Sequence, residues 1–161
     1  MSRRGHLILA VAVAALVVFI DQTSKAWAQS SLPRGREITA INGWLWFRLA
    51  SNSGVTLGLF SGHNQLVAVV SLLVVVAVAM VLLHGQAGGM LGGGALGAIA
   101  GGAIGNVIDR VRLGAVTDFI EVHLWPTDFN LADAAIRIGV VVFVLTLLWD
   151  FLRSRRSPAA G

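Results

Sequence analysis

Four long apolar stretches constrain the fold of this 161-residue chain more than any other feature. They cover residues 7–28, 66–83, 90–108 and 131–152, and each approaches the roughly 20 helical residues that cross the hydrocarbon core of a bilayer. Charged residues make up 12% of the chain, about half the share that is usual in a soluble domain. The sequence therefore predicts a mainly α-helical membrane protein with four transmembrane helices, folded as a single domain over residues 1–161.

Two polar segments separate these spans. The first, residues 29–64, contains the apolar and aromatic run Trp44–Leu49 directly after Asn42 and Gly43. A turn dipeptide followed by such a run is typical of a short strand, and tryptophan favours the edge of the membrane. The second polar segment, residues 110–130, lies before the fourth span. We expect a short strand at the membrane surface in the first of these loops.

An even number of spans places both chain ends on one side of the membrane. Arginines lie in both tails, and cytoplasmic segments of membrane proteins carry an excess of arginine and lysine. We therefore expect both termini in the cytoplasm, although arginines also occur in the opposite loops. Tail arginines suit anionic lipid headgroups, so the net charge of +4 does not indicate nucleic-acid binding. The tail arginines are Arg3, Arg4, Arg153, Arg155 and Arg156.

The first span has an alternative interpretation as a cleavable signal peptide. Arg3 and Arg4 precede its apolar run, and Ala26-Trp27-Ala28 resembles the small-residue pattern of a cleavage site. Cleavage there would remove Asp21 and Lys25, which belong to the polar set described below. We therefore favour a retained transmembrane helix.

Glycine recurs every fourth residue along the third span. Gly89, Gly93, Gly97, Gly101 and Gly105 would share one helix face, where the absence of side chains lets a neighbouring backbone approach closely. A glycine-rich nucleotide-binding loop would instead need a preceding strand, and none is predicted. The spacing therefore indicates helix packing.

Polar and charged residues gather at the predicted outer ends of the spans. Asp118 and Asp133 stand out, because a carboxylate at the edge of hydrocarbon is unfavourable and rarely kept without a use. Paired carboxylates also suit acid–base hydrolysis of peptides, since two close carboxyl groups share a proton. The same predicted face holds Asp21, Lys25, Asn52, Asn106, Asp109, Arg110 and Asn130.

Each of these residues also has a structural interpretation. Asn130 could cap the fourth helix, with Asp133 favoured by the helix dipole. A metal site made from His123, Glu121 and Asp118 is not favoured, because the four histidines are scattered and the chain has no cysteine. From residues alone, a protease, a small transporter using intramembrane carboxylates, and a structural membrane subunit have comparable support.

Five motifs in order resemble the lipoprotein signal peptidases, also called signal peptidase II. Together with the four spans they cover nearly the whole chain. The matching segments are Asp21-Gln22-Thr23-Ser24-Lys25, Asn52-Ser53-Gly54, Gly105-Asn106-Val107-Ile108-Asp109-Arg110, Val116-Thr117-Asp118-Phe119 and Phe129-Asn130-Leu131-Ala132-Asp133.

The resemblance implies an intramembrane aspartyl endopeptidase of the bacterial inner membrane. It would remove signal peptides from prolipoproteins just before the cysteine that carries a diacylglyceryl group, with its active site near the extracytoplasmic face. Asp118 and Asp133 match the catalytic pair, and the first outer loop would form a small extracytoplasmic β-cradle. No metal or cofactor is implied, the expected partners are the lipidated substrate and membrane lipids, and nothing requires more than a monomer. The supporting residues would be Asp21, Lys25, Asn52, Gly54, Asn106, Asp109, Arg110 and Asn130.

The chain departs from the family pattern in three places. Thr56-Leu57 replaces a small residue and a phenylalanine, which is expected to alter the wall of the lipid pocket. Thr117 replaces an aliphatic residue beside the first catalytic aspartate and is expected to add a hydrogen bond. Arg137 lies one turn after Asp133, at a position where an uncharged residue is expected. We expect Arg137 to face a polar neighbour such as Asp109.

Overall fold

The computed structural model describes residues 3–54, 62–85, 88–125 and 127–156. Its helices are α1 (Arg3–Ser31), α2 (Asn64–Leu83), α3 (Gly89–Leu113) and α4 (Leu131–Arg156). All four are long and apolar enough to cross a membrane, as the sequence predicted. All four extend beyond the predicted spans at one end or both, because hydropathy marks only the apolar part of a helix and not its polar ends.

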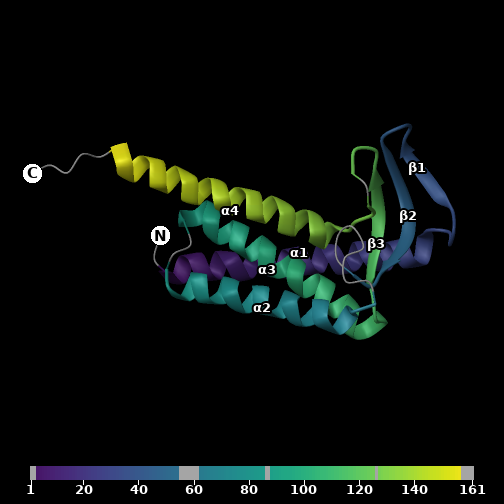
Figure 1. The fold of residues 1–161 in the computed structure, drawn as a ribbon, viewed down its shortest axis with the longest axis horizontal. Helices are drawn as coiled ribbons and strands as arrows, with labels where there is room; N and C mark the ends of the chain where they lie inside the picture. The colour runs from purple at the N-terminus through teal and green to yellow at the C-terminus, as the bar shows by residue number, and fades with distance from the viewer. Residues whose placement is uncertain (1–2, 55–61, 86–87, 126, 157–161) are drawn as a thin grey trace, which may run out of the picture.

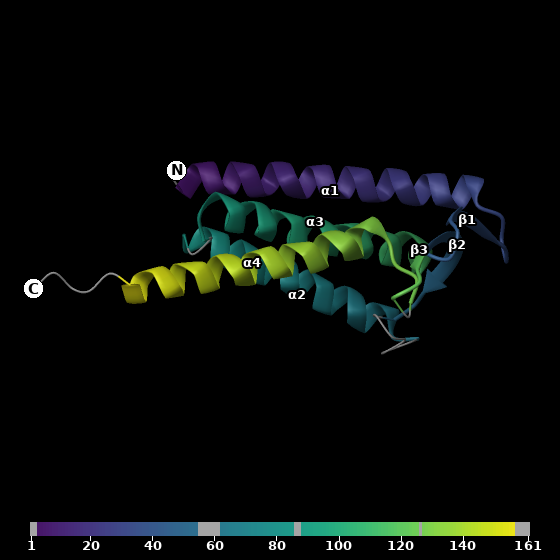
Figure 2. The ribbon, with the colours of Figure 1, turned by 90° about the horizontal axis from the view of Figure 1, so that it is seen from above.

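The helix α3 is the central element of the bundle and packs against the other three helices (Figure 2). Its glycines allow this close approach. A Cβ atom at Gly97 would collide with the carbonyl oxygen of Ala10, and one at Gly101 would lie 2.7 Å from the carbonyl oxygen of Ala14. The glycine spacing therefore correctly predicted a packing face against α1 from Gly93 to Gly105, whereas Gly89 at the start of the helix meets open space.

A three-stranded antiparallel sheet accompanies the helices. It consists of β1 (Glu37–Ile41), β2 (Leu45–Asn52) and β3 (Val116–Val122), in the order β1-β2-β3. The predicted strand is confirmed from Leu45 to Leu49, which lie in β2, whereas Trp44 belongs to the preceding turn, in which Gly43 has a φ of 73°. The sequence analysis did not predict that the second polar loop would supply β3. This strand has only seven residues and pairs with a strand 64 positions away in the register Asn52↔Val116, a long-range contact that no local pattern indicates.

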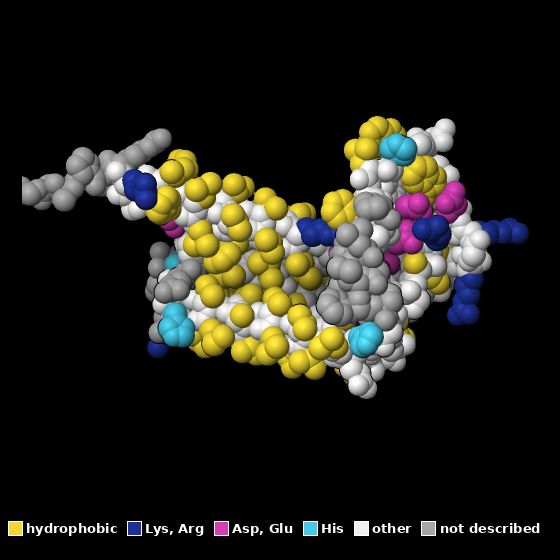
Figure 3. Space-filling view, in the orientation of Figure 1, with side chains coloured by type: hydrophobic (Ala, Val, Ile, Leu, Met, Phe, Trp, Pro, Cys, Tyr) yellow, Lys and Arg dark blue, Asp and Glu magenta, His cyan; other side chains and the backbone are white. Residues whose placement is uncertain are grey.

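The sheet lies at one end of the bundle, and both chain ends lie at the other (Figure 1). Hydrophobic side chains cover the visible sides of the helices, whereas acidic side chains are concentrated around the sheet (Figure 3). The exposed residues on the helix sides include Leu16, Val69, Leu73 and Leu145. An apolar belt of this kind fits a bilayer around the helices, with the sheet outside the hydrocarbon.

Candidate active site

Asp118 and Asp133 come together at the sheet end although they lie on different elements. Asp118 is in β3 and is 1% exposed, whereas Asp133 is in the first turn of α4. Asn130 Nδ2 donates hydrogen bonds to Asp118 Oδ1 at 2.6 Å and to Asn106 Oδ1 at 3.2 Å. Asn106 Nδ2 donates in turn to Asp133 Oδ1 at 2.8 Å. Two side-chain amides therefore connect the two carboxyl groups.

Backbone pairing explains why Asn130 lies beside Asp118. Ile120 and Phe129 exchange N–H···O bonds of 2.9 and 3.0 Å, which hold the segment before α4 against β3. The Asn130 side chain then reaches Asp118, while its Oδ1 accepts the backbone N–H of Asp133 at 2.9 Å. That second bond is the predicted helix cap. One residue thus caps α4 and contacts a candidate catalytic carboxylate.

Asn52 supplies the other contact to Asp118. The β2–β3 register places Ala50 opposite Asp118, so Asn52 lies diagonally across from it. Asn52 Nδ2 donates to Asp118 Oδ2 at 2.9 Å, and Asn52 Oδ1 accepts the backbone N–H of Gly54 at 2.9 Å. The carbonyl oxygen of Gly54 accepts a 2.8 Å bond from Arg110 Nη2. Both oxygens of Asp118 therefore accept amide hydrogen bonds.

A buried ionic network contacts the residues that hold Asp118 and Asp133. Lys25 Nζ lies 2.9 Å from Asp21 Oδ2, 3.2 Å from Asp109 Oδ2 and 3.0 Å from Asn106 Oδ1. Asp21 Oδ1 also accepts the backbone N–H of Ala132 at 3.0 Å. Buried charges require such partners, and these contacts join α1, α3 and the start of α4. Cleavage after residue 28 would leave Asp109 without its cation, so this network supports α1 as a retained helix.

The predicted site residues thus form one connected cluster. Hydrogen bonds and ion pairs link them through the contacts described above. The connected residues are Asp21, Lys25, Asn52, Gly54, Asn106, Asp109, Arg110, Asp118, Asn130 and Asp133.

Burial and the neighbouring carboxylate raise the pKa of Asp118 to about 6. The largest cause is burial, which disfavours the charged form, and the second is repulsion from Asp133. Hydrogen bonds from Asn52 and Asn130 and the charge of Lys25 act in the opposite direction. Asp118 therefore holds its proton at a pH where an ordinary aspartate is ionised.

A pocket of about 230 Å³ opens beside this cluster. Asp133, Asn52, Asn106 and Arg110 contribute its polar lining, and Val67 on α2 is one of the apolar residues that complete it. Since the pocket has Asp133 in its wall, a peptide that enters it would reach the carboxylate.

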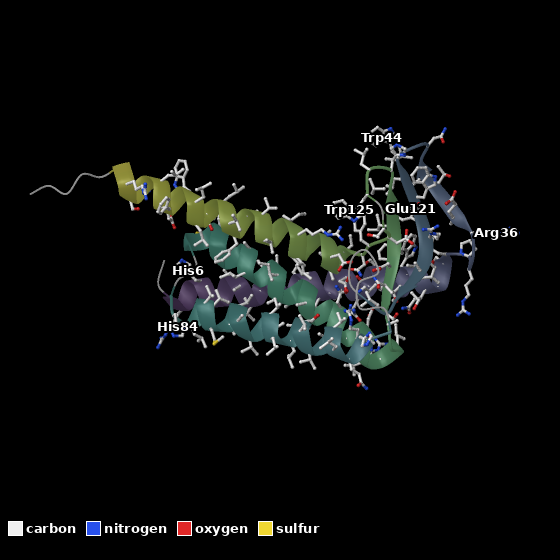
Figure 4. The ribbon with its side chains drawn as sticks, in the orientation of Figure 1. His6, Arg36, Trp44, His84, Glu121 and Trp125 are labelled. Carbon is white, nitrogen blue, oxygen red and sulfur yellow. The ribbon has the colours of Figure 1, made fainter. Side chains whose placement is uncertain are left out.

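Two of the four histidines lie far from the pair of aspartates. Figure 4 shows His6 and His84 at the opposite end of the bundle, and the ring of His123 lies 5.8 Å from that of Trp44. Among the residues that the structure describes, no three histidine, aspartate or glutamate side chains are placed to hold a metal ion.

The expected position of Arg137 was wrong. Its guanidinium carbon lies 4.5 Å from the ring centroid of Trp125 and 5.3 Å from that of Phe129, not beside Asp109. Asp109 already accepts hydrogen bonds from Gln22 and from a backbone N–H, and it pairs with a lysine in the interior. The α4 face that carries Arg137 meets the loop before α4 instead.

Other expectations had mixed outcomes. The extra hydrogen bond at Thr117 is confirmed, since Thr117 Oγ1 accepts a 2.7 Å bond from Gln29 Nε2.

Gln22 was missed as a site residue, although its Nε2 contacts Asp21, Asp109 and a backbone carbonyl. Its position inside the first motif was the available signal. Thr56 and Leu57 lie outside the described residues.

Comparisons with known proteins agree with this arrangement. A sequence profile of the family described as signal peptidase (SPase) II matches residues 13–149. The lipoprotein signal peptidase of Syntrophomonas wolfei subsp. wolfei is 38% identical over 142 residues, covering 88% of this chain and 94% of that protein. The lipoprotein signal peptidase of Xanthomonas campestris pv. campestris strain 8004 is 37% identical over 168 positions, covering 98% and 99% of the two chains.

Solved structures have the same fold. A bacterial membrane enzyme determined by the in meso method superposes with a TM-score of 0.85 at 26% identity, over 93% of each chain. A second bacterial membrane enzyme has a TM-score of 0.78 at 27% identity, over 86% of this chain and 92% of its own. The four helices, the small sheet and the matched sequence agree in one assignment. This chain belongs to the signal peptidase II family of multi-pass membrane proteases.

Proposed function

We propose that this protein is an aspartic endopeptidase that cleaves prolipoproteins just before a diacylglyceryl-modified cysteine, with Asp118 and Asp133 as its catalytic residues. The observation that carries this proposal is the connected pair of carboxyl groups beside a pocket, one of them with a pKa of about 6. Peptide hydrolysis by two carboxyl groups needs one ionised and one protonated group.

The pair would act on a water molecule held between the two side chains. Asp133 accepts a proton from the water as its oxygen attacks the peptide carbonyl carbon, and protonated Asp118 donates a proton to the carbonyl oxygen. The tetrahedral intermediate then collapses. Asp133 returns its proton to the cysteine nitrogen, the hydroxyl proton passes back to Asp118, and the carbon–nitrogen bond breaks. The reaction needs no metal or cofactor.

The supporting residues would keep the two carboxyl groups in place. Asn52 and Asn130 stabilise the orientation of Asp118, and Asn106 does the same for Asp133. The buried Lys25 holds Asn106 through its amide oxygen. Rigid support of this kind keeps catalytic groups within the narrow geometry that hydrolysis requires.

The position of the cluster supports an active site near the outer membrane face. The termini and the sheet lie at opposite ends of the bundle (Figure 1), and the basic tails favour the cytoplasm. Both termini would then be cytoplasmic in the bacterial inner membrane. A lipid-modified cysteine keeps its acyl chains in the bilayer, so its scissile bond would reach the enzyme at this depth. Membrane lipids would surround the helices, and we propose a monomer.

A transporter is not favoured. Proton or ion paths require polar side chains at intermediate depth in the membrane. Among the described residues, every buried polar or charged side chain belongs to the cluster at the sheet end or contacts it.

A processing assay tests the proposal. Wild type, Asp118→Asn and Asp133→Asn would be compared in liposomes on a diacylglyceryl-modified prolipoprotein, with cleavage measured by mass spectrometry. We expect each variant to lose at least about a thousandfold in rate, because each removes one of two interdependent groups. Asp150→Asn, at the other end of α4, is the matched control and should retain activity. Cleavage by either Asp118→Asn or Asp133→Asn at a wild-type rate would contradict the assignment of these two aspartates as catalytic residues.

A further inference from the structure

Arg137 is a half-buried cation that has no ionic partner among the residues the structure describes. Its guanidinium lies over the rings of Trp125 and Phe129 at 4.5 and 5.3 Å. Within the described part of the chain, no carboxylate lies within ion-pair distance of Arg137, and no hydrogen bond ends on its side chain. Aromatic rings attract a cation but leave its N–H groups free, so the five donors of this guanidinium remain available.

Arg137 also lines the pocket that contains Asp133. It lies on α4 one helical turn deeper than Asp133, and its side chain extends back to reach the loop residues Trp125 and Phe129. The same pocket is lined by Arg110, whose buried Nε has no hydrogen-bond partner. The pocket wall therefore holds guanidinium donors that no described residue accepts. Free donors at the edge of hydrocarbon are unfavourable unless a ligand supplies oxygen atoms.

We propose that Arg137 is a substrate-binding residue whose guanidinium binds carbonyl oxygens of the substrate, and that these are the ester carbonyls of the diacylglyceryl group. This inference rests on the proposed function, which brings a lipid-modified cysteine to Asp133. The glycerol esters are attached only a few bonds from the scissile amide, and they lie where polar and apolar layers of the membrane meet. A guanidinium held beside the dyad at this edge matches their position and chemistry.

A role in setting the charge of the dyad is a different reading of the same residue. The groups that shift the pKa of Asp118 are Asp133, Asn52, Asn130 and Lys25, in addition to burial, and Arg137 is not among them. Loss of the Arg137 charge should therefore weaken substrate binding and leave the pH profile in place. Measurements of KM and of the pH profile therefore separate a role in substrate binding from a role in setting the charge of Asp118 and Asp133.

The test compares two substrates that differ only in their lipid linkage. One peptide carries a diacylglyceryl group with ester carbonyls, and the other carries a dialkylglyceryl ether of equal chain length. Arg137→Met keeps the aliphatic stem, Arg137→Lys keeps the charge, and Arg112→Met is the matched control. Arg112 is an exposed arginine in the last turn of α3.

We expect Arg137→Met to raise KM for the ester substrate about tenfold, the lower end of the range for a charged hydrogen bond, because the site is half-exposed. The kcat and the pH profile should not change. Wild type should bind the ether substrate about tenfold more weakly than the ester, and Arg137→Met should not weaken it further. Arg137→Lys should give an intermediate KM, since ammonium lacks the planar fork. The control should resemble wild type.

Three results would overturn the inference. An unchanged KM in Arg137→Met would mean that the residue does not bind substrate. Equal increases for ester and ether would assign the contact to peptide carbonyls instead. A shifted pH profile with unchanged KM would assign a role on the dyad. Dissociation constants of both substrates on the Asp133→Asn background require no turnover, so they decide the question even if wild type does not cleave and the proposed function fails.

Discussion

Replacement of Asn52 by alanine is expected to extend activity to higher pH. Asn52 Nδ2 donates a 2.9 Å hydrogen bond to Asp118 Oδ2, and this bond favours the ionised carboxylate. Its loss should raise the pKa of Asp118 further. Since the proposed mechanism needs Asp118 protonated, kcat/KM of wild type should fall as pH rises through about 6, where this group loses its proton.

The size of the shift follows from that one bond. A hydrogen bond to a charged group contributes about 1.5–3 kcal/mol, and 1.36 kcal/mol corresponds to one pKa unit. Asn52 is only half-buried, so water replaces part of the lost interaction and the lower end of the range applies. The falling limb of kcat/KM should therefore move from about pH 6 to about pH 7.

The assay is the dependence of kcat/KM on pH from about 4.5 to 9, with a lipidated peptide in liposomes, since kcat/KM reports groups of the free enzyme. Asn64→Ala is the matched control. Its side-chain amide donates to the backbone carbonyl of Arg110 at 3.2 Å and not to a carboxylate. The control should keep the limb near pH 6.

Two outcomes would refute the reasoning. A limb that stays in place or moves downward in Asn52→Ala would show that this hydrogen bond does not stabilise the ionised form of Asp118. Activity that rises rather than falls through pH 6 would mean that Asp118 must be ionised, which contradicts its role as the acid.

Two further predictions concern stability. Lys25→Met should destabilise the protein by about 3–5 kcal/mol, because it leaves the buried carboxylates of Asp21 and Asp109 without a cation. Thermal unfolding in detergent measures this loss. A melting temperature equal to that of wild type would contradict the stabilising role of the network. Gly101→Ala should cost about 1–3 kcal/mol by overpacking against the α1 backbone, whereas Gly94→Ala on the same helix meets open space and should not destabilise. Equal melting temperatures for the two glycine variants would show that α1 and α3 do not approach so closely.

The buried network and the site are physically linked. Lys25 holds the amide oxygen of Asn106, and the same amide donates to Asp133. A change at Lys25 should therefore affect both the packing of the helices and the orientation of a candidate catalytic residue. This coupling explains the presence of a buried lysine in a largely apolar helix.

The sequence by itself determined the four helices and indicated a set of candidate site residues. Long apolar stretches permit little besides transmembrane helices, because every backbone polar group in lipid must be paired within the helix. The resemblance in five motifs selected residues that the structure connects in one cluster. The glycine spacing also identified the packing face of α3, since period and residue size are local properties of a helix.

Only the tertiary structure decided how these parts meet. The pairing of β3 with β2 places Asn52 beside Asp118, and the pairing of Phe129 with Ile120 brings Asn130 there. The guanidinium of Arg137 lies over the rings of Trp125 and Phe129 and not, as the sequence had indicated, beside Asp109. Such contacts join residues far apart in the chain, and they depend on the relative position of whole elements. A local pattern of apolar and polar residues carries no information on that position, so it emerges only when the elements pack together.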